Sequence, residues 1–260
     1  IITNVDFKKK VNHIKNIKKL IISKKNFFDY LFYKNHSNKY DNFSDNRNLI
    51  AQILFTSGST GDPKGVVLTH RSMLVNLFDI HNALKIKKVK PRFLSVTPLY
   101  HNNGQFIPTL LPIILNGSTI TISPDTSLIN FWPICVKFKI NYSSIMATHI
   151  NYFNLQKKIK NHNLKSLFCG GAKLDRLSQK RFEKKFNTKI LCNYGLTETS
   201  SIASTESLYN KNYYYGSVGK ALKSNKIKIK KNNSKYGEIL IKGENLFKNY
   251  YGEKKLTNLK

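Results

Sequence analysis

The 260-residue chain lacks long apolar runs and closely spaced pairs of cysteines. It contains no run of about eighteen apolar residues, so we expect no membrane-spanning helix. Its three cysteines, Cys135, Cys169 and Cys192, are widely spaced without a C-x-x-C pair, which favours free thiols in a reducing cytoplasm over disulfides or zinc. The first residues, IITNVDFKKK, include neither an initiator methionine nor a signal-peptide core. We therefore expect a cytoplasmic chain that begins inside a longer protein.

Acidic residues are also scarce, with 14 against 44 lysines and arginines, which gives a formal net charge of +30. Such an excess can mark a protein that binds nucleic acid or an acidic membrane surface. The lysines, however, are spread over the whole chain and accompany heavy use of Asn and Ile, the bias of an AT-rich genome. Composition therefore explains the charge better than a functional basic patch, and a basic nucleic-acid-binding protein stays open as the remote alternative.

The stretch ILFTSGSTGDPKGVVLTHRSML, residues 53–74, begins as an apolar strand and ends as a helix. The apolar run 53–55 suits a strand buried on both faces, and Thr69 can cap a helix over 70–84. Between them, glycines allow backbone N–H groups to approach a ligand, hydroxyls add donors and Lys64 adds a positive charge. A turn so rich in donors suits a polyphosphate.

A solvent-exposed Gly/Ser turn and the nucleotide loop G-x-x-x-x-G-K-[ST] are the competing interpretations of this turn. The second fails, because Gly58 is followed after four residues by Pro63, Lys64 and Gly65, so the second glycine and the final hydroxyl are missing. Residues 55–66 instead resemble, at every place, the phosphate-loop motif [YF]-T-S-G-[ST]-T-G-x-P-K-G-V of the adenylate-forming superfamily. Acyl- and aryl-CoA synthetases, luciferases and peptide-synthetase adenylation domains belong to that superfamily.

Three further loops resemble motifs of the same family. TPLYHNNGQF (97–106) is similar to P-[LF]-[FY]-H-x-x-G, which borders the acyl pocket, and LFCGGAKL (167–174) is similar to G-G-[AE]-x-[LM], which lines the acyl and adenine sites. The resemblance implies an acyl pocket that contains Tyr100, His101, Asn103, Gly104 and Gly171. A histidine that only hydrogen-bonds backbone and a plain glycine turn are the alternatives.

The last of these loops, NYGLTET (193–199), is similar to [NQ]-x-Y-G-x-T-E, although Asn193 directly precedes Tyr194. Tyr194 offers a ring face to adenine, Thr197 a hydroxyl to the α-phosphate, and Glu198 a hard oxygen ligand for Mg²⁺. We expect Lys64, His101, Thr197 and Glu198 to be the catalytic residues, with Glu198 as the metal ligand. The implied ATP site consists of Thr56, Ser57, Gly58, Ser59, Thr60, Gly61, Lys64, Gly170, Gly171, Ala172, Asn193, Tyr194, Gly195 and Thr197.

The order of elements predicts an α/β fold. Strand-like and helix-like segments alternate up to about residue 205, which indicates a parallel sheet with helices on both faces. Ligands of such sheets bind beyond the carboxyl ends of the strands. Period-two alternation at 226–230 and 238–242 predicts that 206–260 begins a small antiparallel β subdomain. The segment 11–23 fits either one helical face or a short strand in KKLIIS, and periodicity does not decide between them.

The resemblance covers residues 49–252 and implies an ATP-dependent carboxylate ligase that forms an acyl-adenylate, releases pyrophosphate and transfers the acyl group to coenzyme A. Transfer to the phosphopantetheine thiol of an acyl carrier protein is the alternative. LYHNNG contains no Asp where amino-acid-activating members have one, which favours a fatty, aryl or small organic acid. The family's Thr-Gly-Asp strand, hinge and C-terminal lid, and the first part of its large domain, have no counterpart here. We therefore expect this chain alone to be poorly active.

Overall fold

The computed structural model describes residues 2–4, 20–22, 46–56, 62–86, 90–115, 118–122, 128–208, 210, 213–231 and 236–253. Contacts divide the chain into two units, 1–45 and 46–260. In the first unit, β1 (Ile2–Asn4) pairs in parallel with β2 (Leu20–Ile22). The strand interpretation of KKLIIS is thus confirmed, whereas the possible helical face at 11–17 lies outside the described residues.

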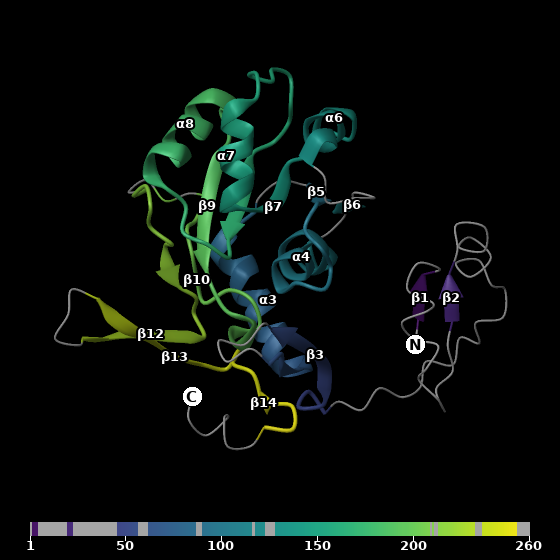
Figure 1. Cartoon of the computed structure of the whole chain (residues 1–260), viewed down its shortest axis with the longest axis vertical. Helices are drawn as coiled ribbons and strands as arrows, with labels where there is room; N and C mark the ends of the chain where they lie inside the picture. The colour runs from purple at the N-terminus through teal and green to yellow at the C-terminus, as the bar shows by residue number, and fades with distance from the viewer. Residues whose placement is uncertain are drawn as a thin grey trace. The chain divides into compact units, whose positions relative to one another are not determined.

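A seven-stranded sheet forms the centre of the second unit, with the order β11-β10-β9-β8-β7-β5-β6 (Figure 1). Its strands are β5 (Arg92–Ser95), β6 (Thr119–Ile122), β7 (Tyr142–Met146), β8 (Ser166–Gly170), β9 (Lys189–Tyr194), β10 (Ser204–Thr205) and β11 (Lys220–Ala221). The five strands from β6 to β9 are parallel to one another, and β10 and β11 run antiparallel at one edge. The predicted parallel sheet is confirmed.

Helices cover both faces of this sheet. One face packs against α6 (Phe131–Lys137), α7 (Ala147–Leu155) and α8 (Arg176–Phe186). The other packs against α3 (His70–Leu84) and the consecutive turns α4 (Asn102–Gln105), η2 (Phe106–Leu110) and α5 (Leu111–Ile114). Neighbouring strand residues alternate between the two cores, as Leu94 and Phe93 do. Each fully buried phenylalanine in these cores contributes roughly 1.5–3 kcal/mol relative to an exposed one.

The two strands that flank the glycine-rich stretch lie outside this parallel sheet, contrary to the expected order. β3 (Ile50–Thr56) and β4 (Lys64–Thr69) form an antiparallel hairpin, and β14 (Asn249–Tyr250) pairs with β4. β3 is therefore an edge strand, and Phe55 is 68% exposed. The prediction that 53–55 is buried on both faces is wrong, because an apolar run alone does not reveal whether a second layer covers it.

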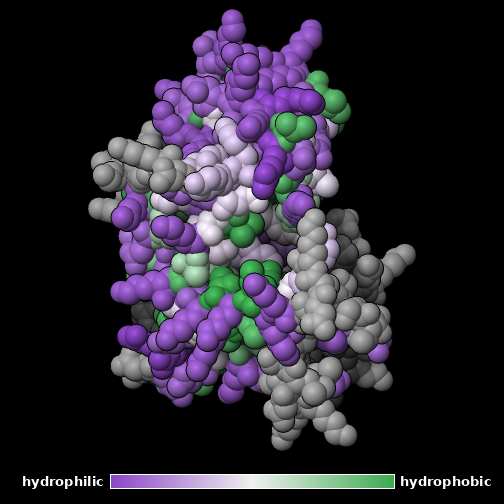
Figure 2. All heavy atoms as spheres, turned by 90° about the vertical axis from the view of Figure 1, so that its left-hand side faces the viewer, coloured by the Kyte–Doolittle hydropathy of each residue, from purple (hydrophilic) through white to green (hydrophobic). Residues whose placement is uncertain are grey.

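The C-terminal part contains the predicted antiparallel ribbon. β12 (Asn225–Lys231) pairs with β13 (Gly237–Gly243), with Lys226 opposite Lys242 and Lys230 opposite Glu238. Lysines alternate along β12, so much of its side-chain surface is hydrophilic. The face drawn in Figure 2 is likewise mostly hydrophilic, with hydrophobic atoms in a few patches. The division of the chain at residue 205 stays a prediction.

The described residues contain no helix long and apolar enough to cross a bilayer. Cys135, Cys169 and Cys192 are buried and free. Burial raises the pKa of all three thiols, and for Cys192 the charges of Glu183 and Glu206 add to this effect and bring the pKa to about 12. These thiols therefore stay protonated and pack as small apolar groups.

Candidate active site

The β3–β4 hairpin presents the first group of candidate residues. Thr56 and Lys64 lie opposite each other in register at the end of the hairpin, and both are half-buried. The backbone between them contains the five expected phosphate-binding residues Ser57, Gly58, Ser59, Thr60 and Gly61, which lie outside the described residues. The structure thus fixes the two ends of the loop on paired strands.

Glu198 belongs to a 3₁₀ turn, η4 (Thr197–Thr199), which follows β9. The segment after β13 holds this turn by three hydrogen bonds. Ser200 Oγ donates to Asn245 O (2.8 Å), Asn245 Nδ2 donates to Thr199 O (2.9 Å), and Phe247 N donates to Glu198 O (2.8 Å). Two segments about fifty residues apart in sequence therefore share one rigid turn.

The carboxylate of Glu198 is itself held by β14. Tyr250 Oη donates to Glu198 Oε1 at 2.7 Å, and Tyr250 lies opposite Val66 of β4, two residues after Lys64. Burial raises the pKa of Tyr250, and the hydrogen bond to Glu198 and its negative charge raise it further. The Tyr250 hydroxyl thus remains a donor at neutral pH. β14 ties the predicted metal ligand to the strand that starts with the predicted phosphate-binding lysine.

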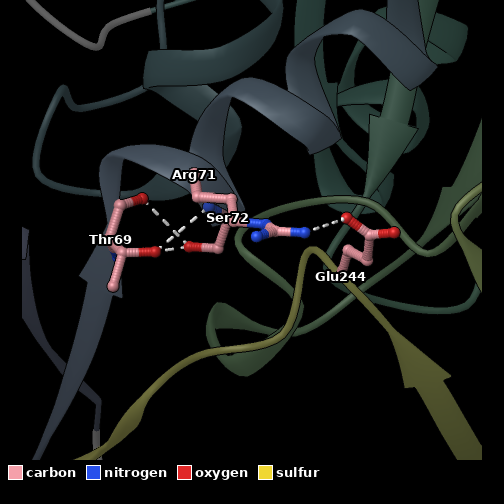
Figure 3. A network of polar contacts seen from close by, with 4 residues as sticks. All are labelled: Thr69, Arg71, Ser72 and Glu244. Carbon is pink, nitrogen blue, oxygen red and sulfur yellow. Dashed lines mark hydrogen bonds and ion pairs between the residues drawn. The ribbon is translucent and has the colours of Figure 1, made fainter. Parts of the chain in front are cut away.

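The start of α3 is fixed beside the same C-terminal segment. Thr69 and Ser72 form a reciprocal capping box, in which Thr69 Oγ1 accepts from Ser72 N at 3.1 Å. Figure 3 shows Arg71 of the same turn reaching Glu244, with Nη2 2.9 Å from Oε2. Both side chains are more than half exposed, so this ion pair contributes only about 0–1 kcal/mol. The ion pair instead helps to position the C-terminal segment, because Glu244 directly precedes Asn245, which hydrogen-bonds to the η4 turn.

The ends of β8 and β9 provide a flat, partly open surface. A Cβ at Gly170 would lie 2.2 Å from Asn193 Oδ1, so the Asn193 side chain occupies the space that a larger residue at 170 would need. Gly171 adopts φ +81° and is exposed, as is Ala172 beside it. Tyr194, Gly195 and Thr197 are half-buried. These residues lie near one another at the ends of β8 and β9, and their role in binding adenine stays a prediction.

The loop after β5 carries the predicted acyl-pocket residues. The rings of Tyr100 and His101 lie 4.8 Å apart, and Tyr100 is 71% exposed. Asn103 points toward the sheet, where its Oδ1 accepts a hydrogen bond from Ser144 Oγ of β7. Gly104 packs on the carbonyls of Thr97 and Pro98. Asn103 and Gly104 are therefore fixed in place, whereas Tyr100 and His101 form an exposed pair.

An apolar cavity of about 460 Å³ adjoins this loop. It is lined by Gln52, Met73, Leu99, Gln105, Thr109, Leu110, Ile113 and Ile120. Gln52 Nε2 donates to Gln105 Oε1 at 3.1 Å across it. Leu99 and Gln105 belong to the stretch TPLYHNNGQF, but no motif gave a role to the other lining residues, which come from separate segments. Tyr250 and Asn245 were likewise given no role.

The donor set fits a magnesium–nucleotide complex. Among the described residues, no group of three or more His, Cys, Asp or Glu side chains could hold a metal ion on its own. Glu198 can supply one carboxylate ligand, so the other ligands would come from phosphate oxygens and water, which is the usual situation for Mg²⁺.

Comparison with known proteins agrees with this donor set. A sequence model described as "AMP-binding enzyme" matches residues 3–251. The chain belongs to the AMP-binding enzyme family. The resemblance to adenylate-forming enzymes is thereby confirmed.

Two relatives illustrate how this family member compares with whole ligases. A 2-succinylbenzoate–CoA ligase of Staphylococcus aureus is 30% identical over 220 residues, which are 83% of this chain and 43% of the relative. A 4-coumarate–CoA ligase-like protein of Arabidopsis thaliana is 31% identical over 220 residues, 80% of this chain and 39% of the relative. The chain thus spans less than half the length of these relatives.

The fold of this AMP-binding chain matches that of solved structures. O-succinylbenzoate coenzyme A synthetase from Bacillus subtilis, in complex with ATP and magnesium ion, superposes with a TM-score of 0.79. The match covers 99% of this chain and 53% of that one at 22% sequence identity. It shows that both chains share the fold.

Proposed function

We propose that the protein containing this chain is an AMP-forming acid–thiol ligase. In the first step it joins a carboxylic acid to the AMP part of ATP, which gives an acyl-adenylate and releases pyrophosphate. In the second step it transfers the acyl group to coenzyme A. The observation that carries the proposal is the bond from Tyr250 to Glu198, which holds the only predicted metal ligand beside the strand that begins at Lys64. Family membership and the CoA ligases among the relatives support the same chemistry.

The first step brings together two anions that repel each other. The substrate carboxylate attacks the α-phosphorus in line, the bond to the bridging oxygen breaks, and pyrophosphate leaves with that electron pair. Lys64 and the hydroxyl of Thr56 would hold the β- and γ-phosphates, and Thr197 would donate to the α-phosphate. Catalysis then rests on positioning and charge neutralisation, and no covalent enzyme intermediate is needed. Mg²⁺ bound at Glu198 would neutralise phosphate charge.

The adenine ring would lie on the surface formed by Gly170, Gly171, Ala172 and Asn193, with Tyr194 against its face. The acid would approach from the Tyr100–His101 side, over Asn103 and Gly104. In the second step the thiol of coenzyme A attacks the acyl carbon and AMP leaves. The small organic acids are favoured over amino acids, because the loop 97–106 offers no carboxylate for an ammonium group.

The test is pyrophosphate release by the longest available form of the protein, screened against a panel of carboxylic acids with and without coenzyme A. We expect Lys64→Ala and Glu198→Ala to lower the rate by about 10²–10³-fold, as loss of a charge-stabilising group does. Lys226→Ala and Glu238→Ala, on the exposed ribbon, are charge-matched controls. If the two site variants keep the full rate, the site assignment is wrong. If a thioester forms on a carrier protein but not on coenzyme A, then the carrier protein is the acyl acceptor and that part of the proposal is wrong.

A further inference from the structure

The loop that joins β9 to β10 contains a strained turn directly after the predicted metal ligand, Glu198. Ser200 adopts φ 62° and ψ −45°, and Ser201 N donates to Thr199 O at 2.8 Å. This is a γ-turn with a positive φ at its centre, a form that is rare because it strains a residue with a side chain. Such strain persists only where the surrounding structure over-determines the backbone.

Two buried amides hold this turn, one on each side. Asn245 bonds to Thr199 and Ser200, as described above. On the other side, Asn76 of α3 pairs with both backbone groups of one residue. Its Nδ2 donates to Ile202 O at 2.6 Å, and its Oδ1 accepts from Ile202 N at 3.2 Å. Both asparagines and Ser200 are fully buried. Loss of the Asn76 amide would therefore remove two buried hydrogen bonds at once.

Asn76 also links the turn to the hairpin that begins β4 with Lys64. α3 starts at His70, directly after β4 ends, and Asn76 lies within the first two turns of this helix. An α-helix rises about 1.5 Å per residue, so only about 10 Å of helix separates the end of β4 from Asn76. The helix thus connects the predicted phosphate-binding strand with the turn that carries Glu198.

We propose that Asn76 is a positioning residue for the binding of a magnesium–nucleotide complex. Its amide holds the strained turn at Ser200, and this turn fixes the direction of the Glu198 carboxylate. Without the amide, the turn would relax toward ordinary backbone geometry and Glu198 would shift with it. The inference rests on the proposed function, in which Glu198 is the magnesium ligand, and adds to it an anchor that comes from α3.

The test measures binding of a fluorescent ATP analogue to the longest available form of the protein, at a series of Mg²⁺ concentrations and in chelator. Asn76→Ala should raise the Mg²⁺ concentration for half-maximal binding about tenfold, because the loss of buried hydrogen bonds is of that order. It should leave the affinity in chelator nearly unchanged, since the amide acts through the metal ligand and not on the nucleotide.

Asn141→Ala is the matched control. Asn141 is also a buried asparagine that pairs with backbone on both sides, since its Oδ1 accepts from Arg92 N at 3.1 Å and its Nδ2 donates to Asn163 O at 3.2 Å. It directly precedes β7, at the amino ends of the parallel strands and away from the candidate site. Asn141→Ala should lower the melting temperature as Asn76→Ala does, but it should not change the Mg²⁺ dependence.

Two variants of Ser200 test the strain itself. Both Ser200→Ala and Ser200→Gly lose the hydroxyl, but only glycine adopts a positive φ without strain. Ser200→Gly should therefore melt about 2–4 °C above Ser200→Ala. In the background of Asn76→Ala, Ser200→Gly should recover about threefold of the lost Mg²⁺ affinity, because the turn then forms without its clamp. If Asn76→Ala does not fold, the Ser200 pair decides, and the Mg²⁺ requirement should rise more in the alanine variant.

The outcomes separate this inference from the proposed function. If Asn76→Ala keeps the Mg²⁺ dependence of the wild type, or loses equal affinity with and without magnesium, the positioning role is overturned and the ligase proposal stands. A melting temperature of Ser200→Ala above that of Ser200→Gly contradicts the strained turn and overturns the inference as well. If the wild type does not bind the analogue, or binds it without any dependence on magnesium, the proposed function fails and the inference fails with it.

Discussion

Glu198 shows how a candidate site residue is held by partners that are remote in sequence. Its carboxylate accepts from Tyr250, which is 2% exposed and packs against Val66, Leu68 and the ring of Phe247. A hydrogen bond to a charged group typically contributes about 1.5–3 kcal/mol. Tyr250 therefore acts as a positioning residue, which turns the carboxylate in one direction and keeps it there.

We predict that Tyr250→Phe weakens ATP binding only when magnesium is present. The ring still fills its place, but Glu198 loses the donor that orients it, so the Mg²⁺ concentration for half-maximal ATP binding should rise about tenfold. Titration of a fluorescent ATP analogue with Mg²⁺, and again in chelator, measures both affinities. Tyr251→Phe, at an exposed neighbour, is the matched control. An equal loss with and without magnesium would show that Tyr250 has only a structural role.

At the residue scale, the motifs predicted the chemistry of the site but not its supports. Lys64, Gly170, Tyr194 and Glu198 stand within short patterns whose residue types have recognisable tasks. Tyr250 lies 52 residues from Glu198, and the two come together through the pairing of β14 with β4 and the hydrogen bonds between η4 and the segment 245–247. The asparagines in LYHNNG gave only a faint indication of a polar pocket. The roles of Lys64, Gly170, Tyr194 and Glu198, like those of residues 57–61, stay predictions.

At the scale of elements, α8 shows how local signals set the boundaries of a helix. Asp175 is its N-cap, and Oδ2 accepts from Ser178 N at 2.8 Å. Lys184 and Lys185 stand in the last turn, where positive charge complements the helix dipole. Phe182 and Phe186 bury one face in the core shared with α6 and α7. The loop before α8 carries Gly171 and Ala172, so the cap also fixes one side of the candidate nucleotide surface.

We predict that the stabilising effect of Asp175 depends on pH. The hydrogen bond from Ser178 N, helped by neighbouring donors, lowers the pKa of this carboxyl below its ordinary 3.8. A lowered folded-state pKa gives stability that is present above pH 3.8 and is lost as the pH falls through the folded-state value. Asp175→Ala should therefore lower the melting temperature at pH 7, and the difference should shrink in acid.

Melting curves of the wild type, Asp175→Ala and Asp175→Asn across this pH range measure the effect. Asn caps a helix as well as Asp does but carries no charge, so the difference between Asp175→Asn and Asp175→Ala should not vary with pH, whereas the wild type should lose its advantage over both in acid. A difference for Asp175→Ala that is constant down to acid pH would contradict the assignment of the cap to the ionised carboxylate.

Sequence patterns identified the elements better than their surroundings. The helix 70–84 and the ribbon strands β12 and β13 followed from capping residues and period-two alternation, which are local signals. The burial of β3 did not follow, because it depends on what packs over the strand. We also did not predict that β3 and β4 form a separate antiparallel hairpin. The alternation of strands and helices suggested one continuous parallel sheet.

At the scale of the whole molecule, the net charge of +30 is the dominant electrostatic fact. With 44 lysines and arginines against 14 acidic residues, most of the positive charge has no acidic side chain to pair with. Like charges repel in the compact state and this repulsion destabilises it. The same positive field should attract anions such as ATP and coenzyme A.

We predict that the melting temperature rises as sodium chloride increases toward about 0.3 M, because salt shortens the Debye length and screens the repulsion. Differential scanning calorimetry at several salt concentrations measures the melting temperature. Replacement of Lys226, Lys228 and Lys230 of β12 by glutamate should reduce the slope, since it removes positive charge from an exposed strand. A melting temperature that falls with salt would show that attractive charge pairs outweigh the repulsion.

The central claim is that the ends of β8 and β9 and the β3–β4 hairpin bind one nucleotide. Photolabelling with azido-ATP, followed by peptide mapping, tests it most directly. We expect label on the peptides containing Gly170–Ala172 or Asn193–Tyr194, protection by ATP, and weaker labelling in Lys64→Ala than in Lys226→Ala. Label concentrated on the lysine-rich segment 157–165, unaffected by Lys64→Ala and abolished by moderate salt, would show that the chain attracts nucleotides by charge alone and would contradict the account.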